Sequence, residues 1–366
     1  MRIGIVTHAS SPFGRQYAAR FAERGHEVVL FAVGGHGGPI PGVSIHSLGE
    51  AGFDPLETQA RTAYLAMVLP LRRLVRQAQP DVLVGIYLSS CGLLACLAGH
   101  PRVVVSALGS DVNTRLGSRL WKRVFAWQGR RACLVHAVSV PLAEALAARC
   151  GVDPAKILVS PVGVDTGLLA LADFALRPAT GEIICTRAHK PIYDQPTLLR
   201  AVARLKEQRV PCRLKFTHAR DADVTRRLAV EMGLKDQVSF LPGYEYAELP
   251  GLLGGADVYV SASLSDGTSQ SLLEAMSTGT FPIVTDIPAN RPWVEHGVNG
   301  FLFPAGDDAA LADRLAEAFA SPALRQEGGR LCRERILAHG DMNREADRLI
   351  EGFRTHCLSR GRPGAA

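Results

Sequence analysis

The stretch ADVYVSASLSDGTSQSLLEAMSTGTFPIVTD (256–286) decides the fold that we predict for this chain. Residues 256–263 are rich in β-branched and aromatic side chains, which is typical of a strand. An apolar pattern of helical period follows at 269–277, and a second strand pattern follows at 281–286. A strand, a helix and a strand in this order predict a parallel sheet. The polar loop that carries Asp266 then lies at the carboxyl end of a parallel strand, where α/β sheets bind ligands.

The alternation of strand and helix patterns runs through the whole sequence and indicates an α/β protein. A length of 366 residues favours two domains, and the periodicity is interrupted once, at 165–182. We therefore expect one Rossmann-like domain at 1–165, a second at 166–340, and a C-terminal helix within 341–366 that packs back on the first domain. The pattern also predicts a long helix at 54–78 with a kink at Pro70, and two closing helices at 307–320 and 342–357.

Charge and cysteine content restrict the class of protein. Residues 1–165 carry 17 Lys and Arg against 10 Asp and Glu, a net charge of +7; the remaining residues carry 24 against 25, a net charge of −1, and together these give +6. The basic first half predicts an anionic partner. No run of 18 apolar residues and no secretory signal pattern is found. Eight scattered cysteines without zinc spacing predict buried, reduced thiols in a cytoplasmic protein.

Several features occur together in residues 255–306. Asp266 is followed by seven residues and then by Glu274, which lies in a small-residue helix. A Gly-to-Pro turn (279–282), a strand and the hairpin sequence NGFLF (299–303) complete the segment. This combination resembles the donor-sugar signature of the family 4 retaining glycosyltransferases, which have the GT-B fold of two Rossmann-like domains facing across a cleft.

The resemblance extends over most of the chain. Residues 80–111 are similar to the core of the family's acceptor-binding domain, and residues 151–165 are similar to its interdomain segment. The resemblance implies that the first domain binds the acceptor and that the second binds a nucleotide-sugar donor. The sequence departs from the family at Asp266, where glutamate is usual, and in the Gly-to-Pro turn, which has one extra residue.

The chemistry of the signature suits a nucleotide diphosphate. A helix N-terminus offers free N–H groups and a positive dipole end to phosphates. Glu274 can accept hydrogen bonds from a ribose diol, and Asp266 can accept them from sugar hydroxyls, although an Asx turn would also explain Asp266. The small or polar donor-binding candidates at the helix N-terminus are Gly267, Thr268, Ser269, Gln270 and Ser271.

A diphosphate also needs cations. Arg187 matches the arginine that the family places after the first strand of the second domain, and we expect it to bind the donor and to act in catalysis with Asp266. At the family's usual lysine position this chain has Tyr193. Lys190 lies in the same loop and is the candidate substitute, against the alternative of a solvated lysine.

Further candidates are less specific. The resemblance places a polar acceptor-side or catalytic residue at Asp111, where a turn or an N-cap is the structural alternative. His8 ends the first strand and is a weak candidate. Gly14 is another, because it lies in the following loop SSPFG (10–14), which resembles the family's glycine-containing loop near the donor but has one glycine where two are usual. Asn290 and Glu295 lie where the family approaches the donor sugar, but a structural turn explains them equally well.

The implied activity is metal-independent, retaining transfer of a hexose-like sugar from a nucleotide sugar to an acceptor hydroxyl, in polysaccharide or glycolipid assembly, with no cofactor. The sequence Asp-Ala-Asp (221–223) superficially matches a metal motif, but we interpret it as a helix N-cap. The alternatives are a nucleotide-sugar epimerase of the same architecture and a nucleotide-sugar-binding module without activity. A dinucleotide oxidoreductase would need GxGxxG after the first strand, and THASSPFG (7–14) lacks it. No nucleic-acid module is found, so nucleic acid is not an expected partner.

The segment TRLGSRLWKRVFAWQGRR (114–131) combines cations with aromatic residues. Helical periodicity predicts an apolar face formed by Leu120, Val124 and Trp127, with the cations around the rest. One interpretation is an ordinary helix with a solvated basic face. The other is a helix that lies on an anionic membrane surface at the inner leaflet, which would make the acceptor a lipid-linked sugar.

Overall fold

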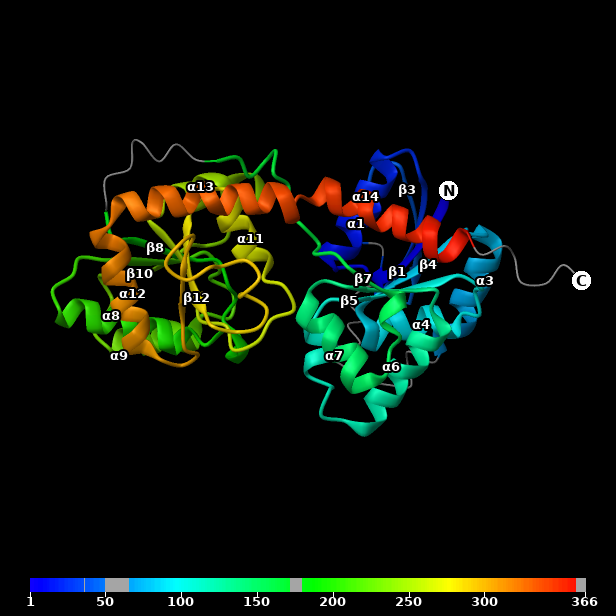
Figure 1. Ribbon diagram of the computed structural model, residues 1–366, viewed down its shortest axis with the longest axis horizontal. Coiled ribbons are helices and arrows are strands. Elements are labelled where there is room, and N and C mark those ends of the chain that lie inside the picture. Colours follow the sequence, from blue (N-terminus) through cyan, green and yellow to red (C-terminus); the bar gives the residue numbers. More distant parts are fainter. Residues whose placement is uncertain (36, 50–65, 172–179, 360–366) are drawn as a thin grey trace, which may run out of the picture. The chain divides into compact units, whose positions relative to one another are not determined.

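The computed structural model describes residues 1–35, 37–49, 66–171 and 180–359 (Figure 1). The chain forms two compact units: unit 1 comprises Met1–Val162 and the segment from Asn343 onward, and unit 2 comprises Gly163–Met342. These divisions lie three residues before and two residues after the predicted boundaries at 165 and 340.

Unit 1 contains a parallel seven-stranded sheet in the order β3-β2-β1-β4-β5-β6-β7. Its inner strands are almost continuously apolar and buried, as expected for a sheet that is covered on both faces. The strands are β1 (Arg2–His8), β2 (Glu27–Val33), β3 (Val43–Leu48), β4 (Val82–Ile86), β5 (Val103–Ala107), β6 (Leu134–Ala137) and β7 (Ile157–Val159). The helices are α1 (Pro12–Glu23), α3 (Val68–Ala78), η1 (Tyr87–Cys91), α4 (Gly92–Leu97), α5 (Ser110–Asn113), α6 (Arg119–Arg131), α7 (Val140–Cys150), η2 (Pro154–Lys156), α14 (Met342–Phe353) and η6 (Arg354–Leu358).

Unit 2 contains a parallel six-stranded sheet in the order β10-β9-β8-β11-β12-β13. Its strands are β8 (Glu182–Cys185), β9 (Arg213–Phe216), β10 (Val238–Phe240), β11 (Val258–Ser261), β12 (Phe281–Thr285) and β13 (Phe301–Phe303). Its helices are η4 (Pro191–Tyr193), α8 (Gln195–Glu207), α9 (Asp223–Glu231), η5 (Tyr246–Glu248), α10 (Leu249–Gly254), α11 (Gln270–Ser277), α12 (Asp308–Ala320) and α13 (Pro322–His339).

Both sheets contain the strand order of a Rossmann fold, in which the first strand is central and the order reverses beside it. The reversal lies between β1 and β4 in unit 1 and between β8 and β11 in unit 2. At such a point the two connections leave in opposite directions, so that the carboxyl ends of the two strands are left open to a ligand. The fold therefore favours ligand binding after β8 and β11, and after β1 and β4.

Helix α13 is a feature that the periodicity did not predict. It contains Gly328 and Gly329, which disfavour a helix on propensity alone. A side chain at Gly329 would begin 2.1 Å from the carbonyl oxygen of Gly279, and one at Gly328 would begin 2.6 Å from the ring of Phe281. The glycine pair thus permits α13 to pack closely on the turn between α11 and β12.

The predicted helix at 54–78 is only partly within the described residues, because 54–65 lies outside them. The described helix, α3, begins at Val68, so Pro70 lies in its first turn. A proline there sacrifices no internal hydrogen bond. Ala66 is also helical, and Met67 interrupts the helix three residues before Pro70, so the kink predicted for the longer helix at Pro70 stays a prediction.

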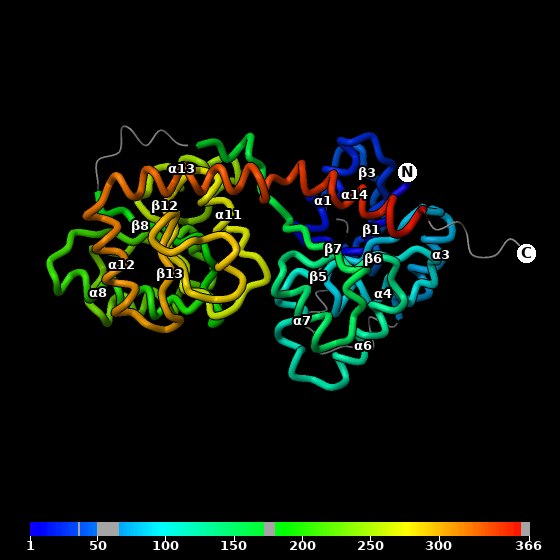
Figure 2. Tube along the Cα trace, in the orientation of Figure 1, coloured from blue at the N-terminus to red at the C-terminus, as the bar shows by residue number. Residues whose placement is uncertain are grey.

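The last helix of the chain belongs to unit 1. In Figure 2 the red end of the trace lies beside the blue beginning. Phe353 meets the ring of Phe21 edge to face at 5.7 Å, and Arg24 forms an ion pair with Asp347. Ala346, Leu349, Ile350 and Phe353 of α14 are all buried in the core of this unit. The contacts attach the C-terminal segment to the first helix of the unit.

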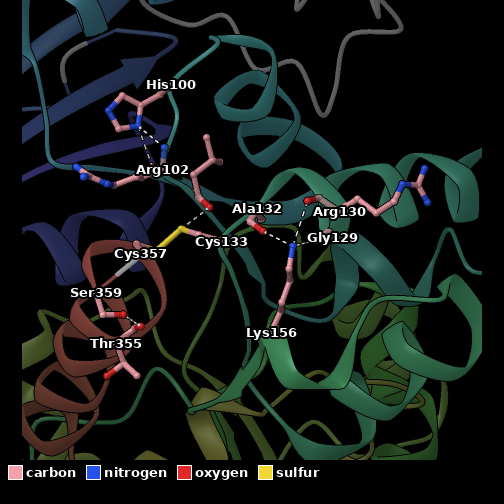
Figure 3. The surroundings of a disulfide bond; sticks show 11 residues. His100, Arg102, Gly129, Arg130, Ala132, Cys133, Lys156, Thr355, Cys357 and Ser359 are labelled. Carbon is pink, nitrogen blue, oxygen red and sulfur yellow. Dashed lines mark hydrogen bonds between the residues drawn. A yellow bond between two sulfur atoms is a disulfide. The ribbon is translucent and has the colours of Figure 1, made fainter. Parts of the chain in front are cut away.

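A disulfide adds a covalent link, which corrects the expectation that every cysteine is reduced. Cys133, which directly precedes β6, is bonded to Cys357 of η6, and their Cα atoms lie 5.4 Å apart (Figure 3). The other six cysteines are buried free thiols. Sequence spacing gave no signal for this pair, because 224 residues separate its members. Within the described ranges, no helix combines the length and apolar character that crossing a membrane requires.

Candidate functional site

Arg187 occupies the point of strand reversal in unit 2, two residues after β8. Its Nη2 donates to Asp266 Oδ2 at 2.7 Å, and its Nη1 donates to the hydroxyls of Ser269 at 3.2 Å and Ser271 at 3.1 Å. The guanidinium also lies over the ring of Tyr193, 3.9 Å from the ring centroid. The side chain is buried, yet its Nε has no hydrogen-bond partner among the described residues. A buried cation is thus held rigidly with one donor unused.

Asp266 contributes the counter-charge to this cation. The two side chains are only 9% and 15% exposed, which makes this a largely desolvated ion pair. Burial raises the pKa of the Asp266 carboxyl above its ordinary value, and the charge and hydrogen bond of Arg187 offset only part of that effect. Asp266 therefore positions Arg187, a role that the sequence reasoning did not assign to it. Its expected contact with sugar hydroxyls stays a prediction.

The N-terminus of α11 lies at the same place. Ser269 is its N-cap residue and accepts from the backbone N–H of Leu272 at 3.4 Å. Gln270 donates from Nε2 to the carbonyl oxygen of Gly163 at 2.7 Å, which fixes the first turn. Gly267 is buried, and Thr268 completes the loop before the helix. These four predicted residues and Ser271 form one contiguous loop and helix start beside Arg187.

Glu274 lies one turn further into α11 and is 9% exposed. Tyr246 of η5 donates its phenolic O–H to Glu274 Oε1 at 3.2 Å. Burial raises the pKa of the Glu274 carboxyl to about 7, and the Tyr246 hydrogen bond and the charge of Arg187 lower it only in part. A carboxylate with so little compensation is costly to bury, so hydroxyl donors of a ligand would stabilise it.

Lys190 and Tyr193 lie at different depths in the loop after β8. Lys190 is exposed and caps the short helix η4, while Tyr193 is half-buried against Arg187. The tyrosine that replaces the family's lysine thus supports the arginine through its ring face. The role of Lys190 at a diphosphate stays a prediction.

Asp111 and His8 lie at the corresponding edge of unit 1. The Asp111 carboxylate accepts from the backbone N–H groups of Leu88 at 2.5 Å, Leu108 at 3.1 Å and Gly109 at 2.9 Å. Burial raises its pKa to about 6 in spite of these bonds. The structure thus gives Asp111 an anchoring role for two loops, and its catalytic role stays a prediction.

The residue after β4 is Tyr87, which adopts a left-handed conformation with φ 69°. Its ring lies 6.3 Å from that of His8, and His8 Nε2 lies 3.4 Å from the hydroxyl oxygen of Ser90. Non-glycine residues in this conformation are uncommon, and strained backbone is concentrated at functional sites. His8 therefore belongs to a polar cluster at the strand reversal of unit 1.

Gly14, Asn290 and Glu295 have structural explanations. A side chain at Gly14 would begin 2.2 Å from Thr7 Oγ1, so glycine lets α1 pack on β1. Asn290 is buried and donates to the carbonyl oxygen of Thr285 at 2.9 Å, which shapes the turn after β12. The side chain of Glu295 is 64% exposed. Among the described residues of unit 2, neither Asn290 nor Glu295 forms a hydrogen bond or ion pair with the Arg187 cluster.

Two tyrosines and a serine at the site were missed by sequence reasoning. Tyr246 contacts Glu274, Tyr259 donates to Ser271 at 2.9 Å, and Ser263 hydrogen bonds to Asp266. Of these three, only Tyr259 and Ser263 could have been suspected from the sequence, because they lie within the strand and loop that carry the donor-sugar signature. In the described part of the chain, no group of three or more His, Cys, Asp or Glu side chains could hold a metal ion.

Comparisons with known proteins identify the family and the fold of this chain. Residues 15–168 match the family model described as Glycosyltransferase Family 4, and residues 181–334 match the one described as Glycosyl transferases group 1. The chain is 26% identical to a D-inositol 3-phosphate glycosyltransferase from Pseudarthrobacter chlorophenolicus, over 93% of this chain and 88% of that protein. Other curated relatives are matched over less than half of their own length.

Solved structures show the same architecture. Sucrose-phosphate synthase from Thermosynechococcus elongatus superposes with a TM-score of 0.78 at 19% identity, over 98% of this chain and all of that one. HepE from Anabaena, solved with UDP-glucose, superposes with a TM-score of 0.75 at 18% identity, over 97% of this chain and 100% of that one. The two family models together account for both Rossmann-like units, and the chain belongs to the family 4 glycosyltransferases, with the GT-B fold.

Proposed function

We propose that this protein transfers a sugar, with retention of anomeric configuration and without a metal, from a nucleotide sugar to an acceptor hydroxyl. The observation that carries the proposal is the pair of buried, under-compensated groups beside one helix N-terminus: the Arg187 guanidinium with an unused Nε, and the Glu274 carboxylate with its raised pKa. A nucleotide sugar offers an anion to the first and a ribose diol to the second. Perturbed, buried ionisable groups at a strand reversal are typical of functional sites.

The proposed role of Arg187 is to stabilise the leaving diphosphate. In the reaction, the bond between the anomeric carbon and the diphosphate oxygen breaks, and a bond from that carbon to the acceptor oxygen forms. The acceptor proton passes to the leaving phosphate oxygen, as the family resemblance implies. Negative charge that develops on the diphosphate would be stabilised by Arg187, by the N–H groups at the start of α11, and by Lys190 if its side chain turns inward.

The proposed role of Glu274 is to accept hydrogen bonds from the ribose, and that of Asp266 is to hold Arg187 and to accept from the sugar. Both need an ionised carboxylate. Because the pKa of Glu274 is about 7, donor affinity should fall as the pH drops through neutrality. The relatives named for D-inositol 3-phosphate and the solved complex with UDP-glucose support a nucleotide-sugar donor and a hydroxylated acceptor.

For the acceptor we propose a lipid-linked sugar at an anionic cytoplasmic surface, reached through α6. The predicted apolar face of this helix is wrong: Phe125, Gln128 and Gly129 are buried, whereas Leu120 is 64% exposed. Gln128 sets the rotation by donating to the carbonyl oxygen of Leu88 at 2.8 Å. The rotation presents Leu120 to solvent between Arg119 and Arg123, which are also exposed. An exposed leucine between cations favours a surface of anionic lipid, at about 1 kcal/mol per cation.

The proposed reaction is tested with UDP-, GDP- and ADP-sugars in the presence of excess EDTA, by following nucleoside diphosphate release and the anomeric configuration of the product by NMR. We expect release from at least one donor, undiminished by EDTA, and a retained configuration. Activity that requires added magnesium or manganese, or an inverted product, would contradict the mechanism. Interconversion of the sugar without an acceptor would instead establish an epimerase.

The proposed surface is tested by cosedimentation with anionic and neutral vesicles at low and high salt. We expect binding to anionic vesicles alone, weakened by salt, and weakened also in the Leu120→Ser variant. Binding that is absent at low salt, or that is independent of anionic lipid, would favour a soluble acceptor.

A further inference from the structure

A second basic site lies in unit 1, at the amino ends of β4 and β5 and therefore at the opposite edge of the sheet from His8. A cavity of about 590 Å³ is present there between α3 and the loop that joins α4 to β5. Its charged lining consists of Arg72 and Arg76 of α3, Arg102 before β5, and Asp81 before β4. This volume is within the range of small-molecule pockets.

The cavity has a surplus of positive charge. Three guanidinium groups face it and one carboxylate does, and that carboxylate already accepts from the backbone N–H of Arg2 at 2.7 Å. Within the part of the chain that the structure describes, Arg72, Arg76 and Arg102 form no ion pair with any acidic side chain. Each guanidinium keeps donors in the fork geometry that suits phosphate oxygens.

Hydrogen bonds fix the loop before β5, which lines the cavity. The backbone N–H of Arg102 donates to His100 Nδ1 at 3.2 Å, and His100 Nε2 donates to the carbonyl oxygen of Pro80 at 2.9 Å. Arg131 also donates to the carbonyl oxygen of His100. Figure 3 shows His100 and Arg102 in one tight loop. His100 Nδ1 also lies 2.9 Å from the carbonyl oxygen of Arg102. Burial lowers the pKa of His100, and the hydrogen bonds to Arg102 and Pro80 offset part of that effect.

Arg72 is placed over the backbone of this loop. A side chain at Gly99, where φ is +80°, would begin 3.7 Å from the Arg72 guanidinium carbon. That distance is an ordinary van der Waals contact, so the guanidinium lies directly beside this loop, and Arg72 also lines the cavity. The cationic groups of α3 and of the β5 start therefore approach one cavity from two sides.

We propose that this cavity binds a phosphate-bearing ligand of small-molecule size, such as a phosphate monoester or a diphosphate. The competing explanation is that the arginines only neutralise helix C-termini. It suits Arg76, which lies in the last turn of α3. It also suits Arg72, whose guanidinium lies beside Gly99 directly after α4. It does not account for Arg102, which precedes a strand, or for the convergence of all three arginines on one cavity. The proposal is independent of the donor site in unit 2.

The test is isothermal titration with pyrophosphate and with inorganic phosphate on the full chain carrying Arg187→Ala, so that the donor site does not contribute. We expect saturable binding that weakens at least tenfold when Arg72→Gln and Arg102→Gln are combined. Arg73→Gln is the matched control, because Arg73 is exposed on the same helix and outside the cavity lining. Thermal melting of each variant verifies that it is folded.

Two results would overturn the proposal: no binding of either anion, or equal affinity in the double variant and the Arg73→Gln control. Unchanged affinity with a lowered melting temperature would establish the helix-capping explanation. Vesicles with and without phosphatidic acid distinguish the sources of the phosphate. A lipid headgroup is identified if the protein sediments with the vesicles, if pyrophosphate abolishes that binding, and if the double variant no longer binds them. A soluble ligand is identified if the protein binds the anions in calorimetry but does not sediment with the vesicles.

Discussion

Glu274→Gln should raise the stability of unit 2 and lower the affinity of the protein for its nucleotide-sugar donor. The folded protein raises the pKa of this buried carboxyl from 4.5 to about 7. At 1.36 kcal/mol per pKa unit, ionising Glu274 at pH 8 costs the folded state about 3 kcal/mol. Glutamine keeps the shape and removes that cost. For a unit of this size we expect a rise in melting temperature of roughly 6–12 °C as an upper limit.

The stability difference between Glu274→Gln and wild type should depend on pH, and the raised pKa of Glu274 determines its direction. Below the ordinary pKa, the carboxyl is protonated in both the folded and the unfolded state, so wild type and variant should differ little. Between pH 4.5 and about 7 the unfolded state loses its proton more readily, and wild type loses stability relative to the variant. Above pH 7 the difference should be constant and at its maximum.

The assay is thermal and urea unfolding of wild type and Glu274→Gln at pH 4.5, 6 and 8, with donor affinity measured by titration. We expect the variant to gain stability only at the higher pH values and to lose roughly 10- to 100-fold in donor affinity, because an amide is a poorer acceptor for the ribose. Tyr246→Phe is the matched control. It keeps the carboxylate but removes its donor, so stability at pH 8 should fall.

Two outcomes would refute this reasoning. Equal stability of wild type and Glu274→Gln at pH 8 would mean that the carboxylate is already well compensated. A stability gain without any loss of donor affinity would mean that the buried charge does not serve the donor.

Three other substitutions test separate parts of the structure. Asp266→Asn should raise the affinity for free nucleoside diphosphate, because Arg187 loses its counter-charge, and should lower the affinity for the nucleotide sugar. Both affinities are measured by titration, and a parallel change in the two would refute the proposed role of the ion pair. Cys357→Ser should lower stability by about 2–5 kcal/mol and make it insensitive to reductant, and a count of eight free thiols in denatured, unreduced wild type instead of six would show that the disulfide is not formed. Gly329→Ala should destabilise unit 2 by about 3 kcal/mol or more, whereas Gly251→Ala, a helical position with open space, should change stability by less than about 1 kcal/mol; equal effects in unfolding experiments would contradict the close packing of α13.

Most of the fold was predictable because parallel strands and amphipathic helices leave distinct periodicities. Helix α13 was not, since its Gly328–Gly329 pair opposes helix propensity and is explained by close tertiary contacts with Phe281 and Gly279. The face of α6 was assigned one position away because a buried glutamine, Gln128, sets the rotation of the helix. An assignment from the pattern of apolar and polar residues places glutamine on the solvent side of a helix, so it could not identify the buried face of α6.

The candidate site was predictable where it is contiguous in sequence. The loop and helix start from Asp266 to Glu274 could be recognised as a unit, and Arg187 was assigned by resemblance. The supporting contacts could not be predicted, because Tyr193 and Tyr246 come from separate segments and meet the site only in three dimensions. The pairing of Cys133 with Cys357 has the same origin.

The central claim is that Arg187 holds the diphosphate of a nucleotide sugar. It is tested most directly by the dissociation constants of UDP, GDP and ADP for wild type, Arg187→Ala and Arg291→Ala. Arg291 is the matched control, because it forms an exposed ion pair with Asp286 in the same unit. Arg187→Lys, which keeps the charge beside Asp266, guards against a folding defect in the alanine variant. We predict that at least one nucleotide binds wild type, that Arg187→Ala weakens it at least tenfold, and that Arg291→Ala leaves it unchanged. Unchanged affinity in a folded Arg187→Ala protein, or no binding of any of the three to wild type, would contradict the account.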